Sequence, residues 1–306
     1  MFKDAADCFL SIYLFLNKNT FSALESGICI IVLSTTIISI RKGLKNMDTW
    51  RLLPLSTNDA FMNMAIDEAI LTSRTAGQVP NTLRFYRWQP SAVSIGKNQN
   101  PEDEIYLDAC KQLGVDLVRR ISGGGTVYHD FEGEVTYSVT ARNTDFGTGD
   151  ITTVYFKIYE AITDALRLIG VPADFSSGDE KNCPNLTVNN KKISGSSQTI
   201  TRGVVLQHGT ILVNVDLPKM FRLLKFKNVS CTLAADIGKR KITSIQNELG
   251  HKISHNTVAN ALAQGFRAIL KIQLKEGDLT PLEVALANQL YKEKYSINNW
   301  NFKSKP

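Results

Sequence analysis

Cysteine and histidine are scarce in this 306-residue sequence, and their scarcity excludes several classes of protein. The five cysteines are widely spaced with no Cys-x-x-Cys pair, and the four histidines form no His-Glu-x-x-His motif. A disulfide framework and a zinc site of the usual spacing are therefore not expected. The sequence identifies no metal ligands, and a reducing cytoplasm is the expected compartment.

Neither sign of charge dominates the composition. Lys and Arg number 35 against 29 Asp and Glu, which gives a formal net charge of +6. A basic pocket for an anionic ligand, or an acidic partner protein, explains this mild excess as well as nucleic acid does. Hydrophobic residues at 43% and charged residues at 21% are typical of a folded globular chain. We predict no nucleic-acid partner.

A long apolar run occurs in the first 46 residues, which differ in character from the rest. The run within 22–40 is interrupted by Ser34 and is shorter than the roughly 20 apolar residues that span a bilayer. Positive residues follow it, so a membrane anchor is one interpretation. We favour a poorly ordered leader or a start codon set too far upstream. A catalytic domain is then expected over 47–306.

Residues 47–306 predict an α+β fold with a mixed, largely antiparallel sheet flanked by helices. Expected strands often follow one another directly, which favours antiparallel pairs over a doubly wound parallel sheet. Alternation or apolar runs predict strands at 83–86, 92–95, 115–118, 126–129, 134–140, 186–188, 191–194 and 204–213. A first helix is expected to follow the capping residues 56–59 and to end at about residue 74. Further helices are expected at 103–113, 150–168, 218–224, 256–270 and 281–293.

A glycine-rich segment between two expected strands offers an anion-binding loop. Arg119-Arg-Ile-Ser-Gly-Gly-Gly-Thr-Val-Tyr-His-Asp130 contains three consecutive glycines, whose N–H groups can surround an anion. The Arg120 guanidinium suits a phosphate or a carboxylate. The segment lacks the Gly-x-Gly-x-x-Gly and Gly-Lys-Ser/Thr patterns, so it matches neither a dinucleotide-binding turn nor a P-loop. A plain glycine-rich hairpin is the structural alternative.

A second segment is a predicted hairpin that carries a lysine. Asn189-Asn190 is typical of a tight turn. Alternation then places Lys192 and Ser194 on one face and Lys191 on the other. We expect Lys192 to point inward beside Gly195, where an anionic partner would offset the cost of burying its charge. A solvated turn lysine is the alternative.

A third segment, Arg202 to Val213, is an apolar strand interrupted by Gln207-His208-Gly209. Glycine within a strand marks a bulge or a close approach of another backbone. Two interpretations of His208 are equally open: it faces a pocket, or it is a hydrogen-bonded core histidine.

These three segments, in this order, resemble the lipoate–protein ligase and octanoyltransferase family, which is related to the biotin–protein ligases. The matching motifs are Arg-Arg-x-Ser-Gly-Gly-Gly-x-Val-x-His-Asp, Lys-Ile-Ser-Gly-Ser and Gln-His-Gly. Each motif alone is weak, but the combination is specific, and the resemblance covers about 50–302. It implies a mixed sheet flanked by helices, like the catalytic core of class II synthetases.

The resemblance also implies a reaction and a set of site residues. In the ligases, a lipoate carboxylate attacks the α-phosphate of ATP, and a lysine of a lipoyl domain then accepts the acyl group from the adenylate. Lys192 would hold the oxygen charge that develops in both steps. Magnesium is expected with the ATP phosphates. The residues implied around the acyl adenylate are Arg120, Ser122, Gly123, Gly124, Gly125, Thr126, Val127, His129, Ser194, Gly195 and His208.

Two departures from the ligase pattern resemble the octanoyltransferase branch of the family. Ligases usually have Asn or Asp soon after the His-Asp pair and Asn-Asp before the lysine hairpin, where this chain has Gly133-Glu134 and Lys181-Asn-Cys-Pro-Asn185. The transferases move octanoate from acyl carrier protein through a cysteine thioester and need no ATP. Cys183 would be that nucleophile, activated by Lys192. The usual alternative for a free cysteine is a small buried residue.

Other features favour the ligase by a narrow margin. The spacing from Cys183 to Lys192 is shorter than the transferase pattern, and the intact triple glycine with Tyr128-His-Asp130 resembles a ligase. The sequence thus predicts a lipoate–protein ligase that uses ATP and Mg²⁺, with a cofactor-free octanoyltransferase as the alternative. A biotin ligase fits the Lys-Ile-Ser-Gly setting less well.

The resemblance implies the partners as well. They are lipoate or octanoate, and the lipoyl domains of 2-oxoacid dehydrogenase E2 and of the glycine cleavage H protein. A separate accessory ligase subunit would join a ligase, and an acyl carrier protein would serve a transferase. An alternative of another class is a non-catalytic module that binds acyl groups or lipoyl domains. The retained Lys192 and the complete glycine loop argue against that alternative.

Overall fold

The computed structural model describes residues 48–177, 184–226 and 229–302. The predicted leader, with the apolar segment 22–40, and Cys183 lie outside these residues. No helix within the described ranges is both long and apolar enough to cross a membrane.

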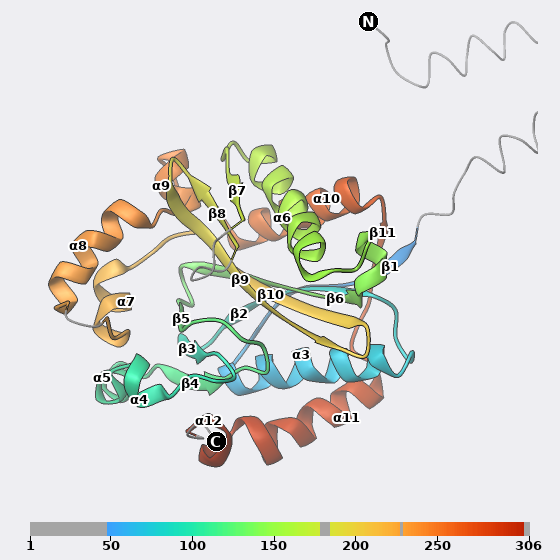
Figure 1. The fold of residues 1–306 in the computed structure, drawn as a ribbon, viewed down its shortest axis with the longest axis horizontal. Helices are drawn as coiled ribbons and strands as arrows, with labels where there is room; N and C mark the ends of the chain where they lie inside the picture. The colour runs from blue at the N-terminus through green and yellow to red at the C-terminus, as the bar shows by residue number, and fades with distance from the viewer. Residues whose placement is uncertain (1–47, 178–183, 227–228, 303–306) are drawn as a thin grey trace, which may run out of the picture. The chain divides into compact units, whose positions relative to one another are not determined.

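The larger sheet has eight strands and is mostly antiparallel (Figure 1). Two of its strand pairs, β11–β1 and β1–β2, are parallel, and the other pairs are antiparallel. The prediction of a mixed, largely antiparallel sheet is therefore confirmed. In order across the sheet, the strands are β11 (Gln273–Glu276), β1 (Thr49–Asn58), β2 (Thr82–Trp88), β6 (Glu134–Arg142), β10 (Val204–Leu212), β9 (Lys191–Thr201), β8 (Asn185–Val188) and β7 (Asp174–Ser176).

A smaller sheet of three strands carries the glycine-rich segment. Its central strand β3 (Ala92–Ile95) pairs in parallel with β4 (Asp116–Arg119) and antiparallel with β5 (Val127–His129). The three consecutive glycines lie in the connection from β4 to β5. This connection therefore begins and ends on neighbours of the same strand.

Helices cover both faces of the large sheet (Figure 1). On one face, α6 (Ile151–Leu168) packs against α10 (His255–Leu270), and on the other α3 (Ala60–Thr75) packs against α11 (Pro281–Leu290). Each helix begins at a side chain that accepts a backbone N–H: Asp150, Ser254, Asp59 and Thr280 respectively. Separate apolar clusters fill the two interfaces, and each large side chain buried there contributes about 1.5–3 kcal/mol.

Shorter helices surround the small sheet and the end of the chain. The helix α7 (Leu217–Leu223) packs with α8 (Cys231–Lys241), and both join an apolar cluster with Val93 and Tyr128 of the small sheet. The remaining helical elements are α4 (Pro101–Glu104), α5 (Leu107–Gln112), a 3₁₀ turn (Asn143–Phe146), α9 (Ile245–Leu249), a π-helical turn (Tyr291–Tyr295) and α12 (Asn298–Asn301).

The sequence-based prediction misses β7, α8, α9 and β11. Two further differences have identifiable reasons. The expected helix 103–113 is two short helices, because Ile105 bridges Leu224 and the Tyr106 N–H donates to the carbonyl of Leu223. The strand β1 is not predicted, because Pro54, which has no N–H, interrupts the pattern. In the structure the register of β1 against β2 shifts between Leu53 and Ser56, which accommodates the proline.

Candidate active site

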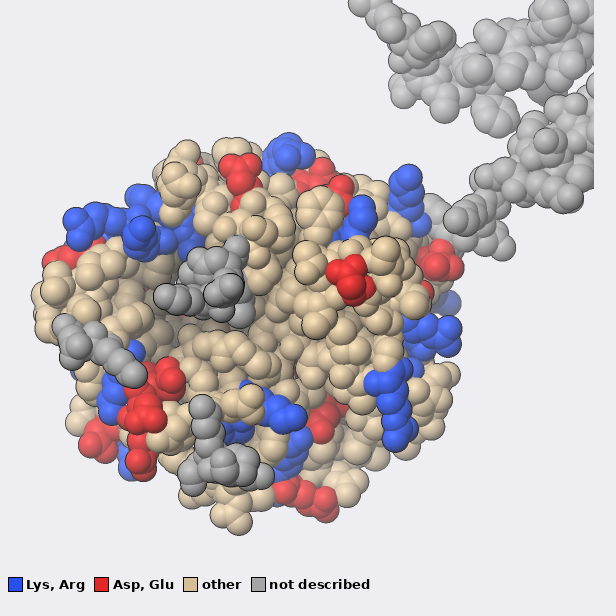
Figure 2. All heavy atoms as spheres, viewed as in Figure 1, with Lys and Arg blue, Asp and Glu red and all other residues tan. Residues whose placement is uncertain are grey.

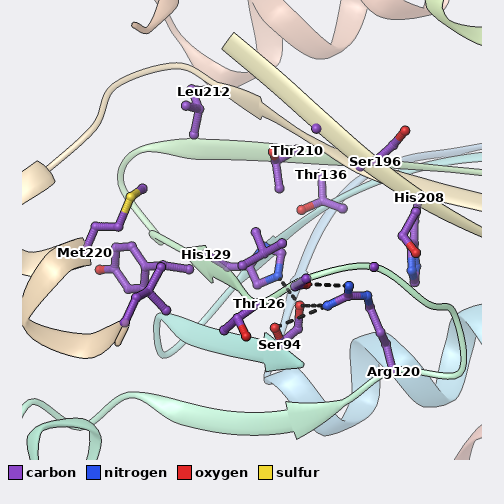
Figure 3. Close-up of a pocket in the computed structure, with 18 of the residues that line it drawn as sticks. Ser94, Arg120, Thr126, His129, Thr136, Ser196, His208, Thr210, Leu212 and Met220 are labelled. Carbon is purple, nitrogen blue, oxygen red and sulfur yellow. Dashed lines mark hydrogen bonds between the residues drawn. The ribbon is translucent and has the colours of Figure 1, made fainter. Parts of the chain in front are cut away.

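A cavity of about 300 Å³ is lined by residues from both sheets and from α7 (Figure 3). It brings together residues that lie far apart in the sequence. Nine of the residues predicted for the site line it: Arg120, Gly124, Gly125, Thr126, Val127, His129, Lys192, Gly195 and His208. Ser122, Gly123 and Ser194 are not among the lining residues, and Cys183 lies outside the described part of the chain.

Arg120 holds the glycine loop in place. Its NH2 group donates to the carbonyl oxygens of Gly123 and Gly125, both at 2.6 Å, and its NH1 group donates to the carbonyl and hydroxyl oxygens of Ser94. Ser197 on β9 donates to the same Gly123 carbonyl at 2.7 Å. Figure 3 shows Arg120 and Ser94 pointing toward each other beneath the loop. The guanidinium expected to bind an anion therefore also fixes the shape of the loop.

Gly124 requires glycine for two reasons. Its φ of +80° lies in the left-handed region, and a Cβ there would lie 3.2 Å from the Arg120 NH2 atom. The loop also packs directly against the end of β3, since a Cβ on Gly96 would lie 2.1 Å from the Gly124 carbonyl oxygen. A side chain at either position would displace the loop.

His129 belongs to one of two carboxylate–histidine–serine chains at the cavity. Its Nδ1 atom lies 2.8 Å from a carboxylate oxygen of Glu134, and its Nε2 atom lies 2.8 Å from the Ser94 hydroxyl. The Trp88 ring stacks on the imidazole, with ring centroids 4.0 Å apart. The Ser94 hydroxyl also accepts a hydrogen bond from Arg120. The series of hydrogen bonds therefore extends from Glu134 to the guanidinium that holds the glycine loop.

His208 forms the second chain. Its Nδ1 atom lies 2.9 Å from Asp67 on α3, and its Nε2 atom lies 2.6 Å from the hydroxyl of Ser122. Burial would raise the pKa of Asp67, but the hydrogen bond to His208 and the charge of Arg84 together hold that pKa below its ordinary value. Both interpretations of His208 are thus combined: it lines the cavity and is hydrogen-bonded on both ring nitrogens. Ser122 is buried behind the wall.

Asp67 is not identified by the motifs in the sequence, although a signal is present. It lies on the apolar face of α3, between Met64 and Ile70, and is almost fully buried. Asp is almost never fully buried without a partner. An acidic residue at helical spacing among apolar residues therefore predicts a buried partner, which the structure identifies as Arg84 with His208.

A bulge in β9 sets the direction of Lys192. Lys192 pairs with Thr187 and Ser194 pairs with Leu186, so Ile193 is an extra residue between the two pairs. The prediction that Lys192 and Ser194 share a face is therefore wrong. Lys192 lines the cavity, whereas Ser194 is buried, and its hydroxyl has no hydrogen-bond partner among the described residues.

The bulge also brings Lys192 alongside Gly195. A Cβ on Gly195 would lie 2.7 Å from both Cε and Nζ of Lys192, so the lysine side chain occupies space that only glycine leaves open. The backbone is held there from outside the sheet, because the Thr243 N–H donates to the Lys192 carbonyl and Ile242 bridges Lys192. Lys192 is exposed rather than buried, and it lines the same cavity as the glycine loop.

Gly209 does not interrupt β10; it marks a place where neighbouring atoms approach the strand closely. The strand pairs with both β6 and β9 without a shift in register. A Cβ on Gly209 would lie 2.6 Å from the Cβ of Ser196 and 2.8 Å from the hydroxyl of Tyr137. The absence of a side chain at Gly209 therefore lets Ser196 and Tyr137 pack directly against the strand.

The chain re-enters the described region at Pro184, close to the cavity wall. The Tyr159 hydroxyl donates to the Pro184 carbonyl at 3.0 Å and is 2.7 Å from the hydroxyl of Ser196, which lines the cavity. Pro184 directly follows the candidate nucleophile Cys183 in the sequence.

The apolar part of the wall is not among the residues predicted from the sequence. These side chains suit a hydrocarbon chain, because apolar surface gains free energy when it leaves water. They are Met64, Tyr86, Trp88, Tyr128, Leu212, Met220, Phe221, Leu224, Phe226 and Ile242. Within the described ranges, no group of three or more His, Cys, Asp or Glu side chains is arranged to hold a metal ion.

Curated relatives match nearly the whole of this folded unit. The octanoyltransferase LipM of Clostridioides difficile is 37% identical over 273 residues, which cover 84% of this chain and 100% of the relative. The octanoyltransferase LipM of Symbiobacterium thermophilum is 36% identical over 272 residues, with 83% and 98% covered.

Solved structures with the same fold include lipoate–protein ligases. A bi-partite lipoate protein ligase from Thermoplasma acidophilum, described with its E2 lipoyl domain, has a TM-score of 0.72 at 33% identity and covers 84% of this chain and 97% of its own. A lipoate-protein ligase A bound with ATP has a TM-score of 0.73 at 31% identity, with 84% and 99% covered. These neighbours confirm the predicted fold class, that of the lipoate ligase catalytic core.

The family model for the lipoyl protein ligase A/B catalytic domain matches residues 59–267. This span includes the glycine loop, the lysine hairpin and the Gln-His-Gly strand that together form the cavity. The predicted resemblance is therefore confirmed, and the chain belongs to the lipoyl protein ligase A/B catalytic domain family, as an enzyme of its ligase and octanoyltransferase group.

Proposed function

We propose that this protein is an octanoyltransferase, which moves an octanoyl group from acyl carrier protein to the lysine of a lipoyl domain. The observation that carries the proposal is the 37% identity to an octanoyltransferase LipM over that relative's entire length. The sequence motifs favour the ligase by a narrow margin, whereas the curated relatives favour the transferase. The lipoyl domains of 2-oxoacid dehydrogenase E2 and of the glycine cleavage H protein are the proposed acceptors.

The cavity supports an acyl substrate. Its wall combines aliphatic and aromatic side chains with polar groups that include Lys192 and the glycine loop. Each methylene removed from water contributes about 0.8 kcal/mol, so a saturated chain gains substantial binding energy from such a wall. These polar groups can stabilise negative charge on the oxygen of the reacting carbonyl.

The first proposed step transfers the acyl group to the enzyme. The Cys183 thiolate attacks the thioester carbonyl of the octanoyl carrier, and the carrier's thiol leaves and takes up a proton. The Lys192 ammonium and the backbone N–H groups of Gly124 and Gly125 stabilise the oxygen that carries negative charge in the tetrahedral intermediate. A lysine charge beside a thiol also favours the thiolate.

The second proposed step releases the acyl group to the acceptor. The neutral ε-amine of the lipoyl-domain lysine attacks the acyl-enzyme thioester, an amide bond forms, and Cys183 leaves as thiolate. The amine loses a proton to solvent in this step. Neither step consumes ATP, so we propose no nucleotide or magnesium requirement. A free reactive thiol also suits the reducing cytoplasm that we propose as the compartment.

The reaction is tested with a lipoyl domain as acceptor and two alternative sets of donors. One tube contains octanoyl acyl carrier protein without ATP, and the other contains lipoate with ATP and Mg²⁺. The proposal predicts modification of the lipoyl lysine, read by mass spectrometry, in the first tube. Modification in the second tube alone would identify a ligase, as in the ATP-bound structural neighbour.

The nucleophile is tested by substitution at matched cysteines. Cys183→Ser should abolish transfer from the octanoyl carrier. Mass spectrometry of the intact variant should also show no octanoyl-enzyme adduct. Cys110→Ala is the control, because Cys110 is buried in the apolar cluster beside α7 and does not line the cavity. Normal transfer by Cys183→Ser would remove this cysteine from the mechanism.

A further inference from the structure

The positive charge of the chain is concentrated in one segment beside the cavity. From Asp216 to Ile242 the sequence contains seven Lys or Arg residues and two Asp residues, a net charge of +5 out of the chain's +6. The rest of the molecule is therefore close to neutral overall. A field of one sign at one surface attracts a partner of the opposite sign and speeds its association.

This segment forms one side of the cavity. Met220, Phe221 and Leu224, in and directly after α7, line the cavity, and Ile242 at the end of α8 bridges Lys192. Figure 2 shows Lys and Arg side chains gathered at the edge of the molecule where Figure 1 places α8. A protein bound to the outer side of α7 and α8 would thus lie next to the acyl site.

The outer side of the two helices also exposes apolar side chains among the cations. Leu233 and Ile237 lie one turn apart on α8 and are 51% and 38% exposed. Arg240 and Lys241 follow one turn later on the same helix, and Arg222 is exposed on α7. We call these five residues the α7–α8 face.

The three cations of this face are available to a partner. In the described ranges, no carboxylate forms an ion pair with Arg222, Arg240 or Lys241, whereas Lys239 is paired with Asp236 at 2.9 Å. Protein interfaces combine an apolar centre with a polar rim, and Arg is enriched in them. The α7–α8 face has this composition.

We infer that the α7–α8 face is the docking surface for the carrier protein that delivers the acyl group, and that this carrier is acidic. The inference rests on the proposed octanoyl transfer. The donor carrier is the proposed partner because its thioester is held on a phosphodiester-linked arm, which brings negative charge to the mouth of the cavity. The acceptor brings a positively charged lysine instead, which a basic surface repels.

Charge reversal on the face tests the inference. In the triple variant Arg222→Glu, Arg240→Glu and Lys241→Glu, kcat/KM for octanoyl acyl carrier protein should fall about tenfold or more, because rim charges mainly govern association. None of the three residues lines the cavity. The rate with octanoyl-N-acetylcysteamine, a small thioester without carrier or phosphate, should therefore stay unchanged.

A matched control makes the same change in charge elsewhere. Arg267→Glu, Lys275→Glu and Lys292→Glu alter exposed residues on α10, on β11 and after α11. This variant should keep the kcat/KM of the unmodified protein for the carrier. Added salt should lower that kcat/KM in the unmodified protein and in the control, and should have a smaller effect on the α7–α8 variant.

The outcomes separate the docking surface from the proposed reaction. Absence of transfer from both octanoyl donors in the unmodified protein would refute the reaction itself. Active transfer with the same carrier kcat/KM in the α7–α8 variant would refute the docking surface alone. An increase in the KM for the lipoyl domain, with unchanged kinetics for the carrier, would assign the face to the acceptor and overturn the inference.

Discussion

The imidazole Nδ1 of His208 lies 2.9 Å from the carboxylate of Asp67, a residue 141 positions away in the sequence. The lowered pKa of Asp67 keeps this carboxylate ionised, so it can only accept, and Nδ1 must carry the proton. In the neutral imidazole, Nε2 then accepts from the Ser122 hydroxyl at 2.6 Å. Asp67 thereby fixes the tautomer of His208, and through His208 it holds Ser122 at the start of the glycine loop.

Asp67→Asn should therefore reduce catalysis without a change in side-chain shape. The amide can donate to Nδ1, which favours the opposite tautomer and removes the acceptor for Ser122. We expect kcat to fall by up to about a hundredfold, because a misplacement of roughly 1 Å in an active site can cost that much. Steady-state acyl transfer and the free energy of unfolding measure the two effects.

The unfolding measurement matters because the Asp67→Asn change would leave the Arg84 guanidinium buried without its carboxylate, at a cost of about 3–5 kcal/mol. Asp59→Asn on the same helix is the control, because Asn caps a helix as well as Asp does. A variant that unfolds normally and transfers acyl groups at the full rate would contradict the role of Asp67.

Lys192→Ala should abolish most of the acyl transfer and leave the fold intact. The change removes the cation from the wall that contains the glycine loop, and loss of one such stabilising group typically lowers kcat by about 10²–10³. The side chain is exposed at one side, so the free energy of unfolding should change by about 0.5 kcal/mol or less. Transfer kinetics and urea unfolding provide the two readouts.

Lys191→Ala is the matched control for this variant. Lys191 is the neighbouring cation on the same strand, pairs with Val188 and does not line the cavity. If both alanine variants lost activity equally, the effect would come from the general charge of the hairpin. Full activity of Lys192→Ala would exclude its amine from the reaction.

The motifs in the sequence predict which residues form the site better than they predict the contacts that these residues make. The glycine loop, Lys192 and His208 each follow from local residue types, and the structure brings them to one cavity. The partners of these residues come from distant segments: Asp67 from α3, Trp88 from β2 and the apolar wall from α7. Such contacts depend on how the sheets pack together, which local periodicity does not encode.

The direction of Lys192 shows the same limit at the level of a single strand. Alternation correctly separates Lys192 from Lys191, but it also places Ser194 with Lys192. The bulge at Ile193 shifts the alternation, so Gly195 joins Lys192 at the cavity and Ser194 does not. A bulge depends on the register of the neighbouring strand, and no residue type within the hairpin identifies it.

Gly124→Ala should disrupt the glycine loop through both backbone strain and contact. The residue has φ +80°, and its new Cβ would lie 3.2 Å from the Arg120 NH2 atom that holds the loop. The strain alone costs about 1 kcal/mol, and displacement of Arg120 should raise the KM for the octanoyl donor. Kinetics at varied donor concentration, with the acceptor saturating, measure this effect.

Gly77→Ala separates the strain from the contact. Gly77 has nearly the same backbone angle, φ +73°, but no neighbouring atom lies within 4 Å of the place that a Cβ would take, and it lies outside the cavity. This variant should lose a similar amount of stability and keep its KM. Equal KM values for the two variants would show that the Arg120 contact does not matter for substrate binding.

Glu283→Gln should destabilise the protein in a way that depends on pH. Glu283 is fully buried, receives two hydrogen bonds from Arg51 and caps the first turn of α11. Burial would raise the pKa of Glu283, but the hydrogen bonds from Arg51 and Thr280 outweigh it and hold the pKa below its ordinary value of 4.5. The glutamine leaves the guanidinium of Arg51 without its charge partner, so the expected loss at pH 7 is about 3–5 kcal/mol.

The sign of the pH effect follows from this lowered pKa. Because the folded protein binds the proton more weakly than the unfolded chain, the ionised carboxylate stabilises the fold fully above pH 4.5 and loses that contribution as the pH falls through the folded value. The difference in the free energy of unfolding between Glu283→Gln and the unmodified protein should therefore shrink on acidification. Urea unfolding from pH 7 to about pH 3 measures it, with the exposed Glu276→Gln on β11 as control. A difference that stays constant over this range would show that the ion pair with Arg51 does not stabilise the junction of β1 and α11.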